Sequence, residues 1–188
     1  MGTLRRRVLG IALLLCAPWA AADEALWALL QGGGQVVLIR HAQTTPGVGD
    51  PPGMRLDDCR TQRNLDERGR AEAARLGSAF KAKQVAIEEL LSSPWCRCVE
   101  TARIAFGRAP RVHAALGNLF GRPELAQPQV AQLKQLAARK PGRGNMVMLT
   151  HGSTIQALTG ILPATAEMVV LTPQPDGELR LAGRLPVQ

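Results

Sequence analysis

The chain has 188 residues, of which 46% are hydrophobic and 3% aromatic, and its formal net charge is +8. This length suits one domain with a complete core and is short for two. The composition excludes a coiled coil, a collagen-like repeat and a disordered chain, and no basic run interleaved with aromatic residues suggests a nucleic-acid partner.

Residues 1–22 have the pattern of a secretory signal peptide. Arg5, Arg6 and Arg7 precede a short apolar stretch, and alanines ending at Ala22 offer a cleavage site before Asp23. The arginine pair also fits a twin-arginine route, and the apolar stretch is too short for a convincing membrane span. We expect a periplasmic or secreted domain of residues 23–188, without a stable membrane span. Loss of three arginines lowers its charge from +8 to +5, which suits an anionic substrate.

The mature sequence begins with a short helix pattern over Glu24–Leu30. Val36–Ile39 is a continuous aliphatic run, typical of a strand buried on both faces, and it ends at Arg40 and His41. The stretch from Thr44 to Asn64 is rich in proline and glycine. We expect a long irregular loop there, and such loops are commonly functional.

Two helix starts follow this loop. Asp66 can cap a helix that runs to about Lys83. Ser93 can cap a second helix, because Pro94 suits the first helical position, and this helix should end at Gly107 with Arg97 in its first turn. The other expected elements are a strand over Ile87–Leu91, an irregular segment over Leu116–Gln127, a helix over Pro128–Arg139, a strand over Met146–Leu149, a short helix from Thr154 to Pro163, and strands over Glu167–Leu171 and Glu178–Leu185.

The order of these elements predicts the fold class. Strands alternate with helices through most of the chain, as in an α/β protein with a mainly parallel sheet. Asp176-Gly177, a dipeptide common in hairpin turns, joins the last two strands. We therefore expect a three-layer sandwich with a doubly wound, mainly parallel sheet and an antiparallel hairpin at its edge.

The mature chain has three cysteines, Cys59, Cys96 and Cys98. In an oxidising compartment, one disulfide and one free thiol is the simplest arrangement. Cys96 and Cys98 point to different sides of the expected helix, so Cys59 should pair with one of them. The three histidines lack the spacing of a zinc site, and we expect no metal.

Two of the apolar strands end in a histidine, His41 after the first and His151 after the third. Ligands of open parallel sheets bind at the carboxyl ends of the strands, so both imidazoles should face one crevice. Arg40 and the helix start that carries Arg97 lie at the same edge, which favours a tetrahedral anion. A neutral imidazole is a competent nucleophile toward phosphorus and needs no cofactor.

The motifs around these residues resemble those of the histidine phosphatase superfamily, the phosphoglycerate-mutase-like fold. They follow the family's order, span most of the mature chain and most resemble those of small exported bacterial members. The four motifs are Val37–Ala42, Asn64–Gly69, Leu91–Ala102 and Leu149–Gly152.

The resemblance implies a metal-independent phosphomonoester hydrolase that acts on a small phosphorylated substrate. His41 would be phosphorylated, Arg40 and Arg97 would bind the phosphoryl oxygens, and His151 would assist them. Thr44 matches a hydroxyl residue that often follows the nucleophile and would contact the site.

The sequence departs from the family at several positions. Ala42 replaces the usual glycine after the nucleophile, and Gly47 stands where an asparagine often binds phosphate. Asn118 takes the place of the acidic residue that many members carry, and Gly152 excludes the branch with aspartate after the second histidine. Glu124 is the nearest acid in that connector, so it is a candidate proton donor whose alternative is a solvated surface carboxylate.

Other interpretations stay open. A catalytically silent phosphate-binding module is compatible with the missing acid, and a phosphoglycerate-mutase-type transferase is disfavoured by export. Gln62 and Arg63 could contact substrate or be solvated loop residues, and Trp95 is expected to pack beneath its helix start. The sequence predicts neither the physiological substrate nor the oligomeric state.

Overall fold

The computed structural model describes residues 18–187, with side chains described from residue 22 onward. Most of the expected signal peptide, residues 1–17, lies outside this part of the chain. The described helices are α1 (Pro18–Gln31), α2 (Glu67–Ala82), α3 (Cys96–Phe106), α4 (Pro123–Ala137) and α5 (Gly152–Thr159). The strands are β1 (Val36–Arg40), β2 (Ile87–Ser92), β3 (Arg111–Val112), β4 (Asn145–Thr150), β5 (Met168–Pro173) and β6 (Leu179–Leu185).

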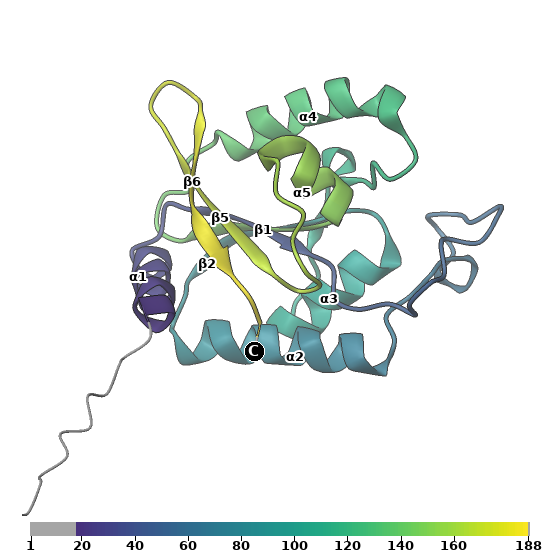
Figure 1. Cartoon of the computed structure of the whole chain (residues 1–188), viewed down its shortest axis with the longest axis horizontal. Coiled ribbons are helices and arrows are strands. Elements are labelled where there is room, and N and C mark those ends of the chain that lie inside the picture. The colour runs from purple at the N-terminus through teal and green to yellow at the C-terminus, as the bar shows by residue number, and fades with distance from the viewer. Residues whose placement is uncertain (1–17, 188) are drawn as a thin grey trace, which may run out of the picture.

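The strands form one six-stranded sheet in the order β3-β2-β4-β1-β5-β6. β3, β2, β4 and β1 run parallel to one another, whereas β5 is antiparallel to β1 and pairs with β6 as a hairpin. The predicted fold, a mainly parallel sheet with an antiparallel hairpin at one edge, is confirmed. Figure 1 shows this hairpin reaching beyond the rest of the sheet.

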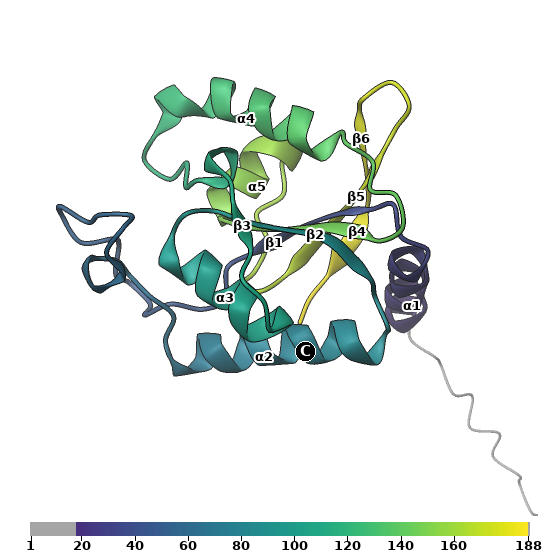
Figure 2. The same ribbon diagram turned by 180° about the vertical axis from the view of Figure 1, so that it is seen from behind.

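Helices cover both faces of the sheet, as Figures 1 and 2 show from opposite sides. Neighbouring residues of β1 point to opposite faces: Val37 packs with α1, α2 and α3, and Leu38 packs with α4 and α5. Both side chains are fully buried. The continuous apolar run in β1 is thus explained by two separate cores, one on each face.

Within residues 18–187, no helix combines the length and the apolar character needed to cross a bilayer.

α3 and α4 begin at positions other than those expected. α3 starts at Cys96, with Trp95 at its cap position. The Ser93 hydroxyl lies 2.8 Å from Nε2 of His151 and accepts only a long hydrogen bond, of 3.4 Å, from the Trp95 amide. Gln62 Oε1 instead accepts a hydrogen bond from the Cys96 amide, at 3.0 Å. α4 starts at Pro123 and contains Pro128, which has no backbone N–H to donate within the helix.

Shorter differences occur elsewhere. α1 is longer than the expected Glu24–Leu30 helix and spans the expected cleavage site after Ala22. α5 begins at Gly152 and ends before Gly160, whose positive φ of 76° stops the helix earlier than Pro163 would. β3 was not predicted, because its two residues are exposed and give no periodic pattern.

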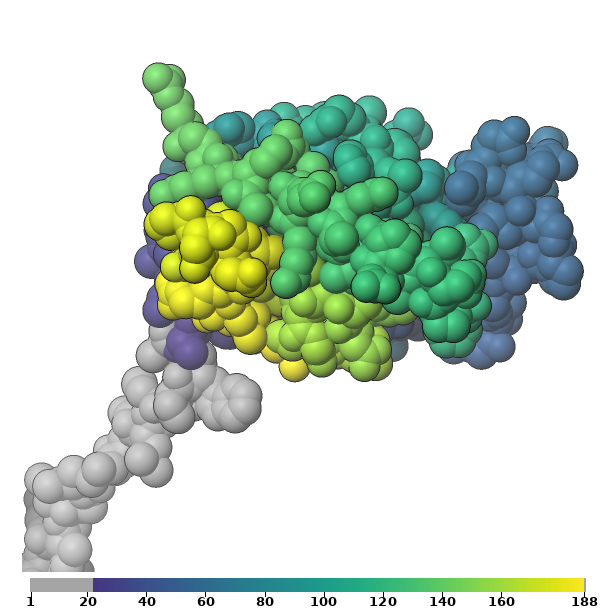
Figure 3. Space-filling model, turned by 90° about the horizontal axis from the view of Figure 1, so that it is seen from above, coloured from purple at the N-terminus to yellow at the C-terminus, as the bar shows by residue number. Residues whose placement is uncertain are grey.

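The segment between β1 and α2 is the long loop that the sequence predicts. It projects from the carboxyl edge of the sheet in Figure 1 and stands out as a separate protrusion in Figure 3. A disulfide joins Cys59 of this loop to Cys96 at the start of α3, across a sequence separation of 37, while Cys98 stays free and buried. Closing a loop of this size stabilises a fold by about 4 kcal/mol in the chain-entropy account.

Candidate active site

The two histidines that end apolar strands lie side by side. β1 and β4 are paired in parallel with Arg40 opposite Thr150, so the next residue of each strand emerges at the same edge. The ring centroids of His41 and His151 are 5.4 Å apart, with the rings inclined at 69°. Their exposed fractions are 4% and 2%.

Hydrogen bonds fix the orientation and the tautomer of the His41 ring. Nδ1 lies 2.8 Å from the carbonyl oxygen of Ala42 and must therefore carry the proton, which leaves the lone pair on Nε2. The backbone N–H of His41 donates to Thr150 O at 2.9 Å, which fixes the residue against β4. Burial, reinforced by the charge of Arg97, lowers the pKa of His41 to about 3. His41 is thus a neutral, oriented imidazole at neutral pH.

α2 also helps to position the segment that follows His41. Gly69, in the first turn of α2, lies directly against the carbonyl oxygen of Gln43, and a Cβ at this position would collide with that oxygen. Glu72, one turn further along, accepts a hydrogen bond from the Gln43 amide at 2.9 Å. The glycine of the Asn64–Gly69 motif therefore allows α2 to approach the segment that follows β1 and His41.

His151 is neutral in this arrangement too. Its Nδ1 lies 3.4 Å from Arg97 Nη2, and a guanidinium group can only donate, so Nδ1 accepts. Nε2 consequently carries the proton and donates to Ser93 Oγ at 2.8 Å. Burial and the neighbouring His41 and Arg97 lower the pKa of His151 well below its usual range. Sequence reasoning assigned Ser93 to the helix cap and missed this role.

Arg97 is fully buried and lies in the first turn of α3, as predicted. Its Nη1 and Nη2 donate to the two carboxylate oxygens of Asp50 at 2.7 and 3.1 Å. Asp50 also accepts from Trp95 Nε1 and from the Arg63 amide, each at 3.2 Å. Burial alone would raise the pKa of Asp50, but the hydrogen bonds and charge of Arg97, together with the hydrogen bonds from the Arg63 amide and Trp95, lower that pKa. Asp50 lies in the irregular loop, where no sequence pattern indicated it.

Arg97 and Arg40 each have a buried Nε–H group without a hydrogen-bond partner. Asp50 binds the two terminal nitrogens of the Arg97 guanidinium, Nη1 and Nη2. Nη2 also faces His151, whereas Nε has no partner among the described atoms. Arg40 donates from Nη1 to Pro163 O at 2.8 Å, and its Nε is likewise buried without a partner. Two guanidinium groups beside two neutral imidazoles form a site suited to a phosphoryl group.

The remaining sequence candidates have different surroundings. Thr44 is buried and pairs through its backbone with Leu65. Glu124 is exposed in the first turn of α4, where an acidic residue favours the helix dipole, and does not lie in the irregular connector expected there. Asn118 Oδ1 accepts from Ser153 Oγ at 2.9 Å. Gln62 is a buried structural residue, so its interpretation as a solvated loop position was wrong.

Among residues 18–187, no group of three or more His, Cys, Asp or Glu side chains is arranged to hold a metal ion. The Trp95 ring, 4% exposed, packs with its centroid 5.1 Å from that of His151. Trp95 therefore supports both the helix start, as expected, and one side of the histidine pair.

The fold, the paired histidines and the arginines beside them agree with the family that the sequence motifs resemble. Residues 36–119 match the sequence model of the histidine phosphatase superfamily (branch 1). No curated protein matches the sequence.

Several solved structures share the fold. The protein histidine phosphatase SixA, complexed with tungstate, is 18% identical with a TM-score of 0.61, and the match covers 80% of this chain and 96% of that one. Phosphoserine phosphatase from Entamoeba histolytica, in complex with 3-phosphoglyceric acid, is 14% identical with a TM-score of 0.61, covering 82% and 98%. A mycobacterial glucosyl-3-phosphoglycerate phosphatase is 18% identical with a TM-score of 0.56, covering 79% and 96%.

Acidification should destabilise the unliganded protein. The folded-state pKa of His41 is about 3 and that of His151 is also lowered, so below the unfolded value near pH 6.5 the unfolded chain binds more protons. The free energy of unfolding should therefore fall with pH by up to roughly 1.4 kcal/mol per pH unit for each histidine. Denaturant unfolding near pH 7 and pH 5 measures this slope, and His41→Asn should reduce it. A slope that is the same in both proteins would contradict the assigned neutral state of His41.

Proposed function

We propose that this protein is a phosphomonoester hydrolase that acts through a phosphohistidine intermediate on His41. The observation that carries the proposal is the state of that ring. Its Nδ1 proton is held by the Ala42 carbonyl and its Nε2 lone pair is free, beside the unpartnered Nε–H groups of Arg40 and Arg97. A nucleophile that is already deprotonated needs no separate base.

The proposed reaction uses these groups in two steps. The dianionic phosphoryl group binds to the unpartnered Nε–H groups of Arg40 and Arg97, and His41 Nε2 attacks phosphorus as the bond to the leaving oxygen breaks. The phosphorylated ring keeps its Nδ1 proton on Ala42 O, which stabilises the positive charge that the ring acquires. Water then attacks phosphorus, the P–N bond breaks, and its electron pair returns to Nε2. Both protons of the water leave with the product, dihydrogen phosphate, which loses one of them to solvent.

His151 has a supporting role in this scheme. The bound phosphoryl dianion opposes the effect of burial and of the arginines, so substrate should raise the pKa of His151. The protonated ring can then donate from Nδ1 toward a phosphoryl oxygen, while Ser93 keeps the Nε2 hydrogen bond. Asp50 stays on the far end of the Arg97 fork and holds the guanidinium in place.

The leaving group should decide the rate. Asn118 supplies a carboxamide, Glu124 is exposed on α4, and Asp50 is held ionised by Arg97. An alkoxide needs a proton as it departs, whereas an aryl oxide does not. We expect p-nitrophenyl phosphate to be hydrolysed far faster than a simple alkyl phosphate, with rates falling steeply as the leaving-group pKa rises.

Glu124→Gln tests the remaining acid. The variant should hydrolyse both esters at the rates of the unchanged protein, as measured by phosphate release from the purified mature domain. A strong loss on the alkyl ester with the aryl ester spared would identify Glu124 as the proton donor and contradict the expectation. Absence of hydrolysis of any phosphomonoester by the unchanged protein would favour the silent phosphate-binding module.

We also propose that the domain works on small phosphorylated compounds outside the cytoplasm. The signal pattern of residues 1–22 supports export, and so does the Cys59–Cys96 disulfide, since disulfides persist in oxidising compartments. Expression of the full chain in a bacterium should yield a periplasmic or secreted protein whose N-terminus is Asp23. A cytoplasmic protein that retains residues 1–22 would contradict export.

A further inference from the structure

The unpartnered polar atoms of the structure are concentrated at one place. In the described part of the chain, the buried side-chain nitrogen and oxygen atoms without a hydrogen-bond partner are Nε of Arg40, Arg63 and Arg97, and Oδ1 of Asn64. Buried donors that stay unsatisfied are costly, so native structures keep few of them without a reason. The Nε atoms of Arg40 and Arg97 belong to the proposed phosphate pocket, which suggests the same reason for Arg63.

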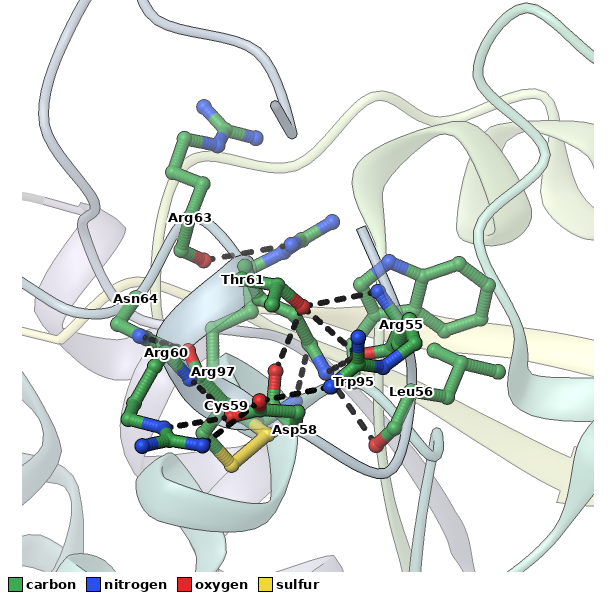
Figure 4. Close-up of a disulfide and its surroundings, with 12 residues drawn as sticks. Arg55, Leu56, Asp58, Cys59, Arg60, Thr61, Arg63, Asn64, Trp95 and Arg97 are labelled. Carbon is green, nitrogen blue, oxygen red and sulfur yellow. Dashed lines mark hydrogen bonds and ion pairs between the residues drawn. A yellow bond between two sulfur atoms is a disulfide. The ribbon is translucent and has the colours of Figure 1, made fainter. Parts of the chain in front are cut away.

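The backbone of Arg63 is part of the same hydrogen-bond network. Its amide donates to Asp50 Oδ1 at 3.2 Å, and its carbonyl oxygen accepts from Arg97 Nη1 at 3.4 Å. Figure 4 shows the side chain of Arg63 and the guanidinium of Arg97 on the side that faces away from the disulfide. The network fixes the main chain of Arg63 and leaves its guanidinium group for another partner.

Electrostatics place the Arg63 charge near both histidines. Arg63 is among the groups that lower the pKa of His41 and that of His151. The pKa of Arg63 itself is lowered, first by burial and then by Arg97, with Arg40 adding to the effect. Like charges gathered in a half-buried space repel one another, and an anion bound between them relieves this repulsion.

We propose that Arg63 is a third phosphate-binding arginine, which donates its Nε–H to the phosphoryl group held by Arg40 and Arg97. The Asp50 carboxylate bonds to the guanidinium of Arg97 and offsets its charge, whereas the guanidinium of Arg63 has no bonded carboxylate among the described residues. A phosphomonoester dianion would supply the missing negative partner. The inference rests on the proposed function and adds a residue from the long loop to its binding site.

The test compares two arginines of the same loop. Arg63→Gln removes the guanidinium but keeps the backbone contacts to Asp50 and Arg97, and Arg60→Gln is the matched control because the Arg60 side chain is 90% exposed and pairs with Asp58. Calorimetric titration with inorganic phosphate should show binding about 10- to 100-fold weaker for Arg63→Gln, the usual range for a lost charged hydrogen bond. Arg60→Gln should bind phosphate as tightly as the unchanged protein, and KM for p-nitrophenyl phosphate should follow the same order.

Each outcome decides the inference. Unchanged phosphate affinity in Arg63→Gln would overturn it, and so would an equal loss in Arg60→Gln, which would reveal only a general effect of charge. If the unchanged protein hydrolyses p-nitrophenyl phosphate and Arg63→Gln binds phosphate equally well, the proposed function stands without a role for Arg63. If the unchanged protein neither binds phosphate nor hydrolyses p-nitrophenyl phosphate, the proposed function and the inference about Arg63 both fail. Thermal unfolding checks the fold of each variant. Should Arg63→Gln not fold, Arg63→Lys, which keeps the charge but lacks the Nε–H, must still weaken phosphate binding for the inference to stand.

Discussion

Replacing His41 by alanine should abolish phosphoryl transfer, with a loss of roughly 10⁴-fold or more in kcat, as expected when a covalent nucleophile is removed. The physical reason is that Nε2 of His41 carries the lone pair that would attack phosphorus, next to the unpartnered Nε–H groups of Arg40 and Arg97. Incubation with a labelled phosphomonoester followed by a quench in base should trap an acid-labile phosphohistidine in the unchanged protein. The label should be absent from His41→Ala.

The third histidine provides the control. His113 caps a short 3-10 helix, where its ring accepts a hydrogen bond from the Ala115 amide at 3.2 Å. His113→Ala should therefore retain both the label and the hydrolytic rate. Label that survives unchanged in His41→Ala would assign the nucleophile to another residue and remove the basis of the proposed reaction.

Arg97→Lys should lower kcat/KM by about 100-fold or more, equivalent to roughly 3 kcal/mol of transition-state stabilisation. Lysine keeps the charge, but it cannot bond to both oxygens of Asp50 and also present an N–H edge to a phosphoryl group. Arg97 is fully buried, so no solvent replaces the lost contacts. Steady-state kinetics with p-nitrophenyl phosphate measures the effect.

Arg103→Lys is the matched control for this substitution. Arg103 lies on the same helix, α3, but its side chain is exposed. It should leave the kinetics and the thermal unfolding unchanged. Equal activity in Arg97→Lys and Arg103→Lys would place the guanidinium of Arg97 outside the phosphoryl site and restrict Arg97 to a structural contact with Asp50.

The type of most elements, strand or helix, and so their order along the chain, was predictable because local sequence patterns indicate it. Val36–Ile39 and Met146–Leu149 are short, uninterrupted apolar runs, which are typical of strands covered on both faces. The sheet then places the residue after each run at the same edge, which is how the sequence indicated that His41 and His151 would meet. Helix starts were predicted less well, since Pro94, Pro123 and Pro128 offered similar local signals and tertiary contacts chose among them.

The hydrogen-bond partners of Arg97 and His151 could be identified only from the tertiary structure. Asp50 reaches Arg97 from an irregular loop, and Ser93 turns from its expected cap to His151; neither contact has a sequence spacing that could announce it. The choice of Cys96 over Cys98 as the partner of Cys59 was equally open in the sequence. Periodicity encodes which face of an element is buried, whereas hydrogen bonds between distant segments depend on how the loop closes over the sheet edge.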